Sequence, residues 1–99
     1  MYTVIERWKV NPERMQETFE RAQSDFFPEL QQARGFISFY LVAVDANGIN
    51  TSITVWENKT QADAFNEENS SWMRTLTDYG FTLQTENRGE TVITIEPQR

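Results

Sequence analysis

The hydrophobic periodicity of this chain switches between two and about 3.6 residues, in the order strand, helix, strand, strand, helix, strand. Side chains repeat every second residue in a strand and every three to four residues on one face of a helix, so each stretch favours one conformation. The expected strands cover residues 2–10, 36–44, 49–57 and 90–96, and the expected helices cover residues 12–33 and 60–79. A β-α-β-β-α-β order within 99 residues predicts one ferredoxin-like α+β domain over residues 1–99, with a four-stranded antiparallel sheet.

Residues that end or bend regular structure add detail to this outline. Pro28 removes a helical hydrogen bond and predicts a kink near Phe27 in the first helix. The run Asn69-Ser70-Ser71 disfavours helix and indicates a division of the second one. Asn47-Gly48 lies between two strand-like runs, which is a strong signal for a hairpin.

The stretch from Phe36 to Val44 is apolar on both of its faces. By simple alternation one face carries Phe36, Tyr40, Val42 and Val44, and the other carries Ile37, Phe39, Leu41 and Ala43. Two helices cover only one face of a four-stranded sheet, and this strand lies at the sheet edge in ferredoxin-like topology. A second copy of the same sheet would cover the other face, so we expect a homodimer. The alternative is a monomer with a well-filled core and a few exposed apolar side chains.

Composition excludes several classes of partner and chemistry. Nine Lys and Arg against 15 Asp and Glu give a net charge of −6, whereas nucleic acids and anionic membranes are bound by basic surfaces. The chain has no cysteine and no histidine, which excludes disulfides, thiolate catalysis, zinc–thiolate sites and a Ser-His-Asp triad. It shows neither a secretion signal nor an apolar run as long as a membrane helix. We therefore expect a cytoplasmic protein without nucleic-acid or membrane partners.

Several short motifs resemble one family in combination. They are Glu6-Arg7-Trp8 in the first strand, Ala33-Arg34-Gly35-Phe36 between helix and strand, and Ile53-Thr54-Val55-Trp56-Glu57 before the second helix, which continues with Ala62, Phe65 and Asn66. Together they resemble the antibiotic-biosynthesis-monooxygenase-like (ABM) domains of the dimeric α+β barrel superfamily. The resemblance implies a homodimer with one pocket per subunit, between the sheet and its own helices. Some members are cofactor-free oxygenases of polycyclic phenols, which implies no cofactor and a small apolar aromatic ligand.

Another branch of that family degrades haem, and this chain departs from its pattern. That branch uses an Asn in the first strand, a Trp on the second helix and a His further along. The corresponding positions here are Glu6, Glu68 and Thr77, and no histidine is present to ligate haem iron. We therefore expect no haem-degrading activity.

Glu6 and Asn66 are the candidate catalytic residues. Glu6 shares a strand face with Trp8, and if that face points at the helices, burial raises the carboxyl pKa towards the range of a general base. The alternatives are an ion pair with an arginine or a solvated strand end. Asn66 follows Phe65 and would hold a carbonyl or an anion derived from dioxygen, with an ordinary solvated helix position as the alternative.

Five aromatic side chains are the candidate pocket walls: Trp8, Trp56, Phe65, Trp72 and Tyr79. An aromatic residue on a core-facing position commonly belongs to the core, so a structural role is the alternative for each of them. No metal-binding or cofactor-binding residues are predicted.

Two functions of different classes follow from these patterns. The first is a cofactor-independent monooxygenase acting on a small aromatic or polyketide-like molecule, with Glu6 as the base. The second is a non-catalytic, dimeric ligand-binding or stress-related domain, in which core side chains fill the pocket. The sequence leaves both open, and with them whether the protein is an enzyme.

Overall fold

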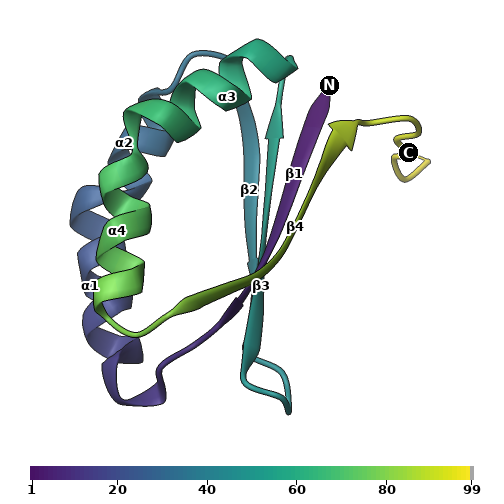
Figure 1. Ribbon diagram of the computed structural model, residues 1–99. Coiled ribbons are helices and arrows are strands. Elements are labelled where there is room, and N and C mark those ends of the chain that lie inside the picture. The colour runs from purple at the N-terminus through teal and green to yellow at the C-terminus, as the bar shows by residue number, and fades with distance from the viewer. Residues whose placement is uncertain (99) are drawn as a thin grey trace.

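A sheet and a layer of helices form the computed structural model, which describes residues 1–98 (Figure 1). The strands are β1 (Tyr2–Lys9), β2 (Phe36–Val42), β3 (Ile49–Trp56) and β4 (Thr82–Glu90). The helices are α1 (Met15–Asp25), α2 (Phe27–Gln32), α3 (Lys59–Glu68) and α4 (Ser70–Asp78), and a short 3-10 turn, η1 (Pro12–Arg14), precedes α1. The strands pair antiparallel in the order β2-β3-β1-β4, with the helices on one face. This arrangement confirms the predicted ferredoxin-like βαββαβ fold.

Both predicted helix interruptions are confirmed. Helices α1 and α2 are separated at Phe26, and Pro28 lies in the first turn of α2, where its missing N–H breaks no intrahelical bond. Helices α3 and α4 are separated at Asn69. The predicted turn between β2 and β3 also forms, since Gly48 adopts a φ of +76° and its N–H donates to the Asp45 carbonyl at 3.1 Å.

The predicted position of the last strand is wrong. β4 covers Thr82–Glu90, whereas residues 91–98 have no regular structure. The segment that forms β4 is mostly polar, and it pairs with β1 through its backbone, with Tyr2 opposite Glu90. Backbone pairing at a sheet edge requires no apolar side chains, so hydrophobic periodicity does not detect such a strand. The apolar residues of the predicted strand stand exposed near the C-terminus instead: Val92 at 89%, Ile93 at 74% and Ile95 at 87%.

A bulge in β2 changes which of its residues share a face. The register between β2 and β3 shifts directly after Phe36. Residues opposite one another in antiparallel strands point to the same side of a sheet. Phe36 therefore faces the helices together with Phe39 and Leu41. This corrects simple alternation, which groups Phe36 with Tyr40 and Val42.

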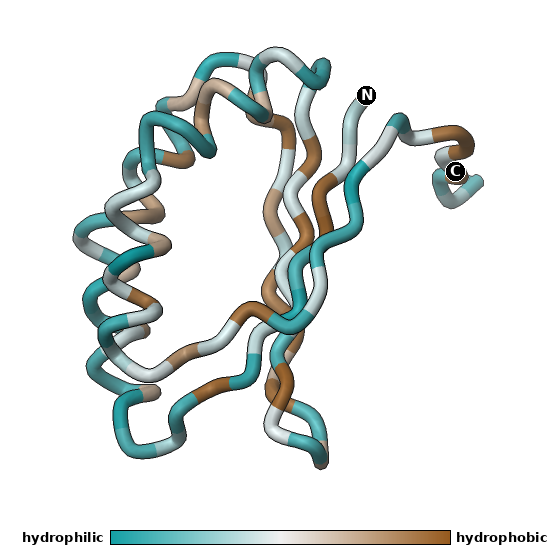
Figure 2. Tube along the Cα trace, viewed as in Figure 1, coloured by the Kyte–Doolittle hydropathy of each residue, from teal (hydrophilic) through white to brown (hydrophobic). Residues whose placement is uncertain are grey.

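Two buried clusters lie between the sheet and the helices. One consists of Tyr2, Val4, Leu30, Trp56 and Ala62, and the other of Trp8, Val10 and Phe81. Figure 2 shows hydrophobic residues recurring along the strands, whereas the helices mix hydrophobic and hydrophilic residues. Among the described residues, no helix combines the length and the apolar character needed to cross a lipid bilayer.

Candidate functional site

The β3 strand turns most of its polar side chains towards the helices. Pairing with β1 places Trp8 opposite Asn50 and Glu6 opposite Ser52, so these residues share the helix-facing side. The complete inner row of β3 is Asn50, Ser52, Thr54 and Trp56, and the outer row is Ile49, Thr51, Ile53 and Val55. A sheet face that only packs against helices is normally apolar. The inner row of β3 therefore does more than fill a core.

A cavity of about 140 Å³ lies over this inner row, between the sheet and helices α1, α2 and α4. Its aromatic walls are Trp8, Phe19, Phe26, Phe27, Phe39, Trp72 and Phe81. Its polar lining consists of Thr18, Asn50, Ser52 and Thr54. Phe19 and Leu41 line the cavity and are about half exposed, so it opens to solvent between α1 and β2. The cavity is therefore lined mainly by aromatic side chains, with polar side chains along β3.

A smaller recess of about 70 Å³, lined by Glu6, adjoins this cavity. Phe26, Thr54 and Trp72 line both spaces. The rings of Phe26 and Trp72 are stacked, with centroids 5.3 Å apart and planes inclined by 11°. This stacked pair therefore forms part of the boundary that the cavity and the recess share.

Glu6 faces the helices, as the catalytic hypothesis requires. Burial has the largest effect on its carboxyl and raises the pKa above the usual value of 4.5. The indole N–H of Trp8 donates to Glu6 Oε1 at 3.4 Å, and this hydrogen bond partly lowers the pKa again. Glu86 lies opposite Glu6 in β4, and its negative charge raises the pKa further. The net effect makes Glu6 a stronger base than an exposed glutamate.

Arg88 brings a positive charge to the same recess. Its Nη1 lies 3.0 Å from Asp63 Oδ1, and its Nε lies 3.4 Å from Glu86 Oε1. These two carboxylates hold the guanidinium, and within residues 1–98 no lysine or arginine forms an ion pair with Glu6. The same part of the chain contains no group of three or more acidic side chains placed to hold a metal ion.

The recess brings together five of the predicted site residues: Glu6, Trp56, Phe65, Asn66 and Trp72. Trp72 lines both spaces, and Trp8 lines the larger cavity. Trp56 is also fully buried in the first core cluster, where its ring centroid lies 5.1 Å from that of Phe65. Asn66 is exposed and borders the recess from α3.

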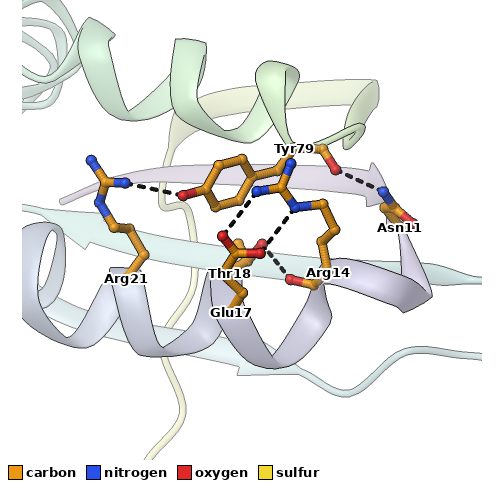
Figure 3. A network of polar contacts seen from close by, with 6 residues as sticks. All are labelled: Asn11, Arg14, Glu17, Thr18, Arg21 and Tyr79. Carbon is orange, nitrogen blue, oxygen red and sulfur yellow. Dashed lines mark hydrogen bonds and ion pairs between the residues drawn. The ribbon is translucent and has the colours of Figure 1, made fainter.

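Tyr79 lines neither of these two spaces. Figure 3 shows it at the end of α4, where the Arg14 guanidinium carbon lies 3.8 Å from its ring centroid and Arg21 Nη1 donates to its hydroxyl at 3.0 Å. Arg14 also pairs with Glu17 at 2.9 Å, and the Asn11 side chain donates to the Tyr79 carbonyl at 2.8 Å. The network ties α1 to α4, two of the helices that wall the larger cavity.

The sequence-based candidates did not include Asn50, Ser52, Thr54, Glu86 or Arg88. The sequence could have indicated the three β3 residues. They lie two, four and six residues before Trp56, so they share a strand face with a residue that was expected to point inward. The sequence could not have indicated the two β4 residues, because a polar segment resembles a loop and is recognised as a strand only by its backbone pairing.

Comparison with known proteins identifies a family and several similar folds. A family model described as antibiotic biosynthesis monooxygenase matches residues 1–71. The matched region includes Glu6, Asn66 and the whole of β3. A search of curated protein sequences finds no match.

Three solved structures illustrate the shared fold. A conserved protein from Methanosarcina mazei has a TM-score of 0.74 at 18% identity, over 92% of each chain. A monooxygenase from Streptomyces coelicolor, solved with nanaomycin D, has a TM-score of 0.75 at 12% identity, over 98% of this chain and 92% of the other. SnoaB, described as a cofactor-independent oxygenase from Streptomyces nogalater, has a TM-score of 0.68 at 17% identity, over 98% and 97% of the two chains. At these identities the similarity concerns the fold alone.

Proposed function

Because this chain belongs to the antibiotic biosynthesis monooxygenase family, we propose that it is a cofactor-independent monooxygenase of a small aromatic or polyketide-like molecule. The observation that carries the proposal is an aromatic cavity of about 140 Å³ whose adjoining recess is lined by the partly buried Glu6. Two similar structures support it, since one is described as a monooxygenase with nanaomycin D and the other as a cofactor-independent oxygenase. The ring-lined walls suit a flat, fused-ring ligand that stacks on them.

The proposed chemistry begins with proton transfer to Glu6. An activated C–H or phenol O–H of the substrate loses its proton to the Glu6 carboxylate and leaves an electron-rich anion. In an anthrone-type substrate this anion reduces dioxygen and bonds to it, giving a peroxide that loses water to form a ketone. One methylene group and one dioxygen thus become one carbonyl group and one water, without an external reductant. Asn66, at the border of the recess, is the proposed hydrogen-bond donor to the peroxide oxygen.

We also propose that two copies of the chain pair through the helix-free face of the sheet. Register places Ile5, Ile53, Tyr40 and Val42 on this face, where Tyr40 is 59% and Val42 is 52% exposed. Proteins in water rarely leave a contiguous apolar patch uncovered. A two-fold dimer needs the same self-complementary patch on both subunits, and the outer rows of β2 and β3 supply one.

Dioxygen uptake tests the catalytic proposal. With 1,8-dihydroxyanthrone as substrate, we expect uptake by the wild type and a loss of about 100-fold or more in Glu6→Gln, because a general base contributes about 10²- to 10⁴-fold. Glu67 is an exposed glutamate on α3, so Glu67→Gln is the matched control and should keep the wild-type rate. Equal rates in the wild type and Glu6→Gln would contradict the role of Glu6 as base.

The non-catalytic alternative predicts ligand binding without turnover. Trp8 and Trp72 line the cavity, so their fluorescence reports its occupancy. Saturable quenching by hydroxylated aromatics, with no dioxygen uptake for any anthrone or hydroquinone tested, would favour a binding role. Absence of both quenching and uptake would contradict a functional cavity altogether.

A further inference from the structure

Glu6 and Glu86 are two carboxylates that lie opposite one another in the sheet. They pair across β1 and β4, on the side of the sheet that faces the helices. Directly opposed residues of antiparallel strands have Cβ atoms roughly 4.5–5.5 Å apart, close enough for two carboxyl groups to meet. In the strand pairings of residues 1–98, this is the one position where two charged side chains oppose each other. Like charges opposite one another destabilise a sheet, so strand pairing alone does not explain the arrangement.

Arg88 fixes the position of Glu86. Its Nε lies 3.4 Å from Glu86 Oε1, and its Nη1 lies 3.0 Å from Asp63 Oδ1 on α3. Asp63 also pairs with Lys59 at 2.7 Å. The guanidinium is therefore anchored between α3 and β4, with its positive charge beside the Glu86 carboxylate.

The two opposed carboxyl groups have different surroundings. Glu6 lines the recess, and within residues 1–98 its carboxylate accepts a hydrogen bond only from the Trp8 indole, at 3.4 Å. The side chain of Glu86 is 33% exposed and has the Arg88 cation beside it. A proton taken up by the pair therefore binds to Glu6, where charge is less well compensated, and the Glu86 carboxylate can accept a hydrogen bond from it.

No other ionisable group of the described chain faces Glu6 as directly. Ser52 lies opposite it on β3, and the recess residues between positions 62 and 73 carry neutral side chains. Burial contributes most to the raised pKa of Glu6, and the Glu86 charge and a hydrogen bond between the two carboxyl groups raise it further, against the Trp8 contact and the Arg88 charge. Besides burial and Trp8, β4 therefore supplies the groups that control Glu6.

We propose that Glu86 is a positioning residue for Glu6: its carboxylate accepts the hydrogen bond of the protonated Glu6 carboxyl, so that the two side chains bind one proton as a pair. Arg88 and Asp63 keep Glu86 in place for this role. The pairing is a property of the free protein, and it rests on the proposed function only for its part in turnover. There the pair holds the substrate proton on Glu6 until the peroxide anion takes it back, so the cycle gains and loses no proton.

NMR titration of the Glu6 carboxyl tests the pairing without any substrate. In protein isotope-labelled at the glutamate Cδ atoms, the Glu6 signal is the one that disappears in Glu6→Gln. We expect its titration midpoint to lie at lower pH in Glu86→Gln than in the wild type, because the repelling charge is gone and the glutamine amide can donate to the Glu6 carboxylate. Glu90→Gln removes the same charge from the same row of β4, opposite Tyr2, and should leave the midpoint unchanged.

A second variant, Arg88→Gln, should shift the Glu6 midpoint in the opposite direction, to higher pH, because a nearby positive charge is lost. A midpoint that is the same in the wild type and Glu86→Gln, or that falls equally in Glu90→Gln, would overturn the pairing.

Dioxygen uptake distinguishes this outcome from a failure of the proposed function. With 1,8-dihydroxyanthrone, the acidic limb of the pH profile of kcat/KM should move to lower pH in Glu86→Gln, because Glu6 acts as a base only when it is deprotonated. An unmoved limb would overturn the role of the pair in turnover. No uptake by the wild type, together with a lowered NMR midpoint in Glu86→Gln, would contradict the proposed function and support the pairing.

Discussion

Glu6 is placed where its negative charge is disfavoured. Burial removes water from the carboxylate, and Glu86 faces it across the strand pair, so its pKa is higher in the folded than in the unfolded chain. Between those two pKa values the folded protein binds more protons than the unfolded one, so its free energy of unfolding falls as pH rises. The stabilising contribution of the protonated carboxyl is complete below about pH 4.5 and is lost as pH rises through the folded pKa.

The variant Glu6→Gln isolates this effect. Glutamine keeps the shape of the side chain but cannot ionise, so we expect a higher Tm than the wild type at neutral pH and a difference that shrinks as pH falls to about 4.5. Thermal melts measure the Tm of both proteins at each pH in this range. The difference between the two Tm values cancels the contributions of the other carboxyls. Glu67→Gln supplies the baseline for an exposed position. A difference that does not vary with pH would mean that the Glu6 pKa is not raised.

Asn50 gives a second prediction at the scale of a single residue. An unsatisfied buried acceptor costs about 1–3 kcal/mol, so Asn50→Leu should raise the free energy of unfolding by about 1 kcal/mol or more. In a domain of this size, each kcal/mol of added stability raises the Tm by roughly 4–8 °C. Thermal denaturation without ligand is the measurement, with Thr51→Ala as the control. A lower Tm in Asn50→Leu would show that Asn50 stabilises the fold despite its unsatisfied acceptor.

At the scale of elements, side chains around Tyr79 join α1 and the turn before it to α4. The Tyr79 ring lies under Arg14 of η1, and its hydroxyl accepts from Arg21 of α1, so one residue at the end of α4 contacts both elements (Figure 3). The ring also packs against the second core cluster. The packing of the ring, more than the hydroxyl, should hold α4 in place, because the Arg21 contact is exposed to water.

Two substitutions separate these contributions. Tyr79→Ala removes a half-buried ring and should lower the free energy of unfolding by about 1–2 kcal/mol. Tyr79→Phe keeps the ring and loses only the exposed hydroxyl contact, so its stability should stay close to that of the wild type. Urea denaturation measures both variants. A loss in Tyr79→Phe as large as in Tyr79→Ala would assign the effect to the hydroxyl instead.

At the scale of the whole molecule, the apolar outer face of the sheet predicts the oligomeric state. We expect light scattering to give twice the chain mass of 11.6 kDa. Ile53→Glu introduces a charge at the centre of this face and should give a monomer. Gln23→Glu adds the same charge on the exposed side of α1 and should remain dimeric. A monomeric wild type at all concentrations would contradict the proposed interface.

The C-terminal segment gives a separate prediction about assembly. Val92, Ile93 and Ile95 are 74–89% exposed in a β-branched run that resembles a strand but pairs with none of the described strands. We expect this run to pack on the second copy, so a chain ending at Thr91 should dimerise more weakly. Sedimentation at a series of concentrations compares the truncated and full-length chains. Equal dissociation constants would show that the segment lies outside the interface.

Local patterns in the sequence were sufficient for most of the elements. Side-chain periodicity, Pro28, Asn69 and the Asn47-Gly48 turn act over a few residues, so they predicted the βαββαβ order, both helix interruptions and the hairpin. They also predicted the family, since the motifs that resemble it are short and lie within single elements or at their junctions. The position of β4 could not be predicted in this way, because a polar edge strand is defined by pairing with β1.

Much of the site was decided by contacts between distant parts of the chain. Sequence placed Glu6 and Trp8 on one face, but only pairing with β3 and β4 put Ser52 and Glu86 beside Glu6. Register depends on backbone hydrogen bonds between strands far apart in sequence, and a shift of one residue would turn every side chain of a strand to the other face. The sequence by itself therefore determined the order of the elements and the family of the chain. Only the tertiary structure decided that the polar row of β3 faces the cavity, and with it the chemistry the protein can perform.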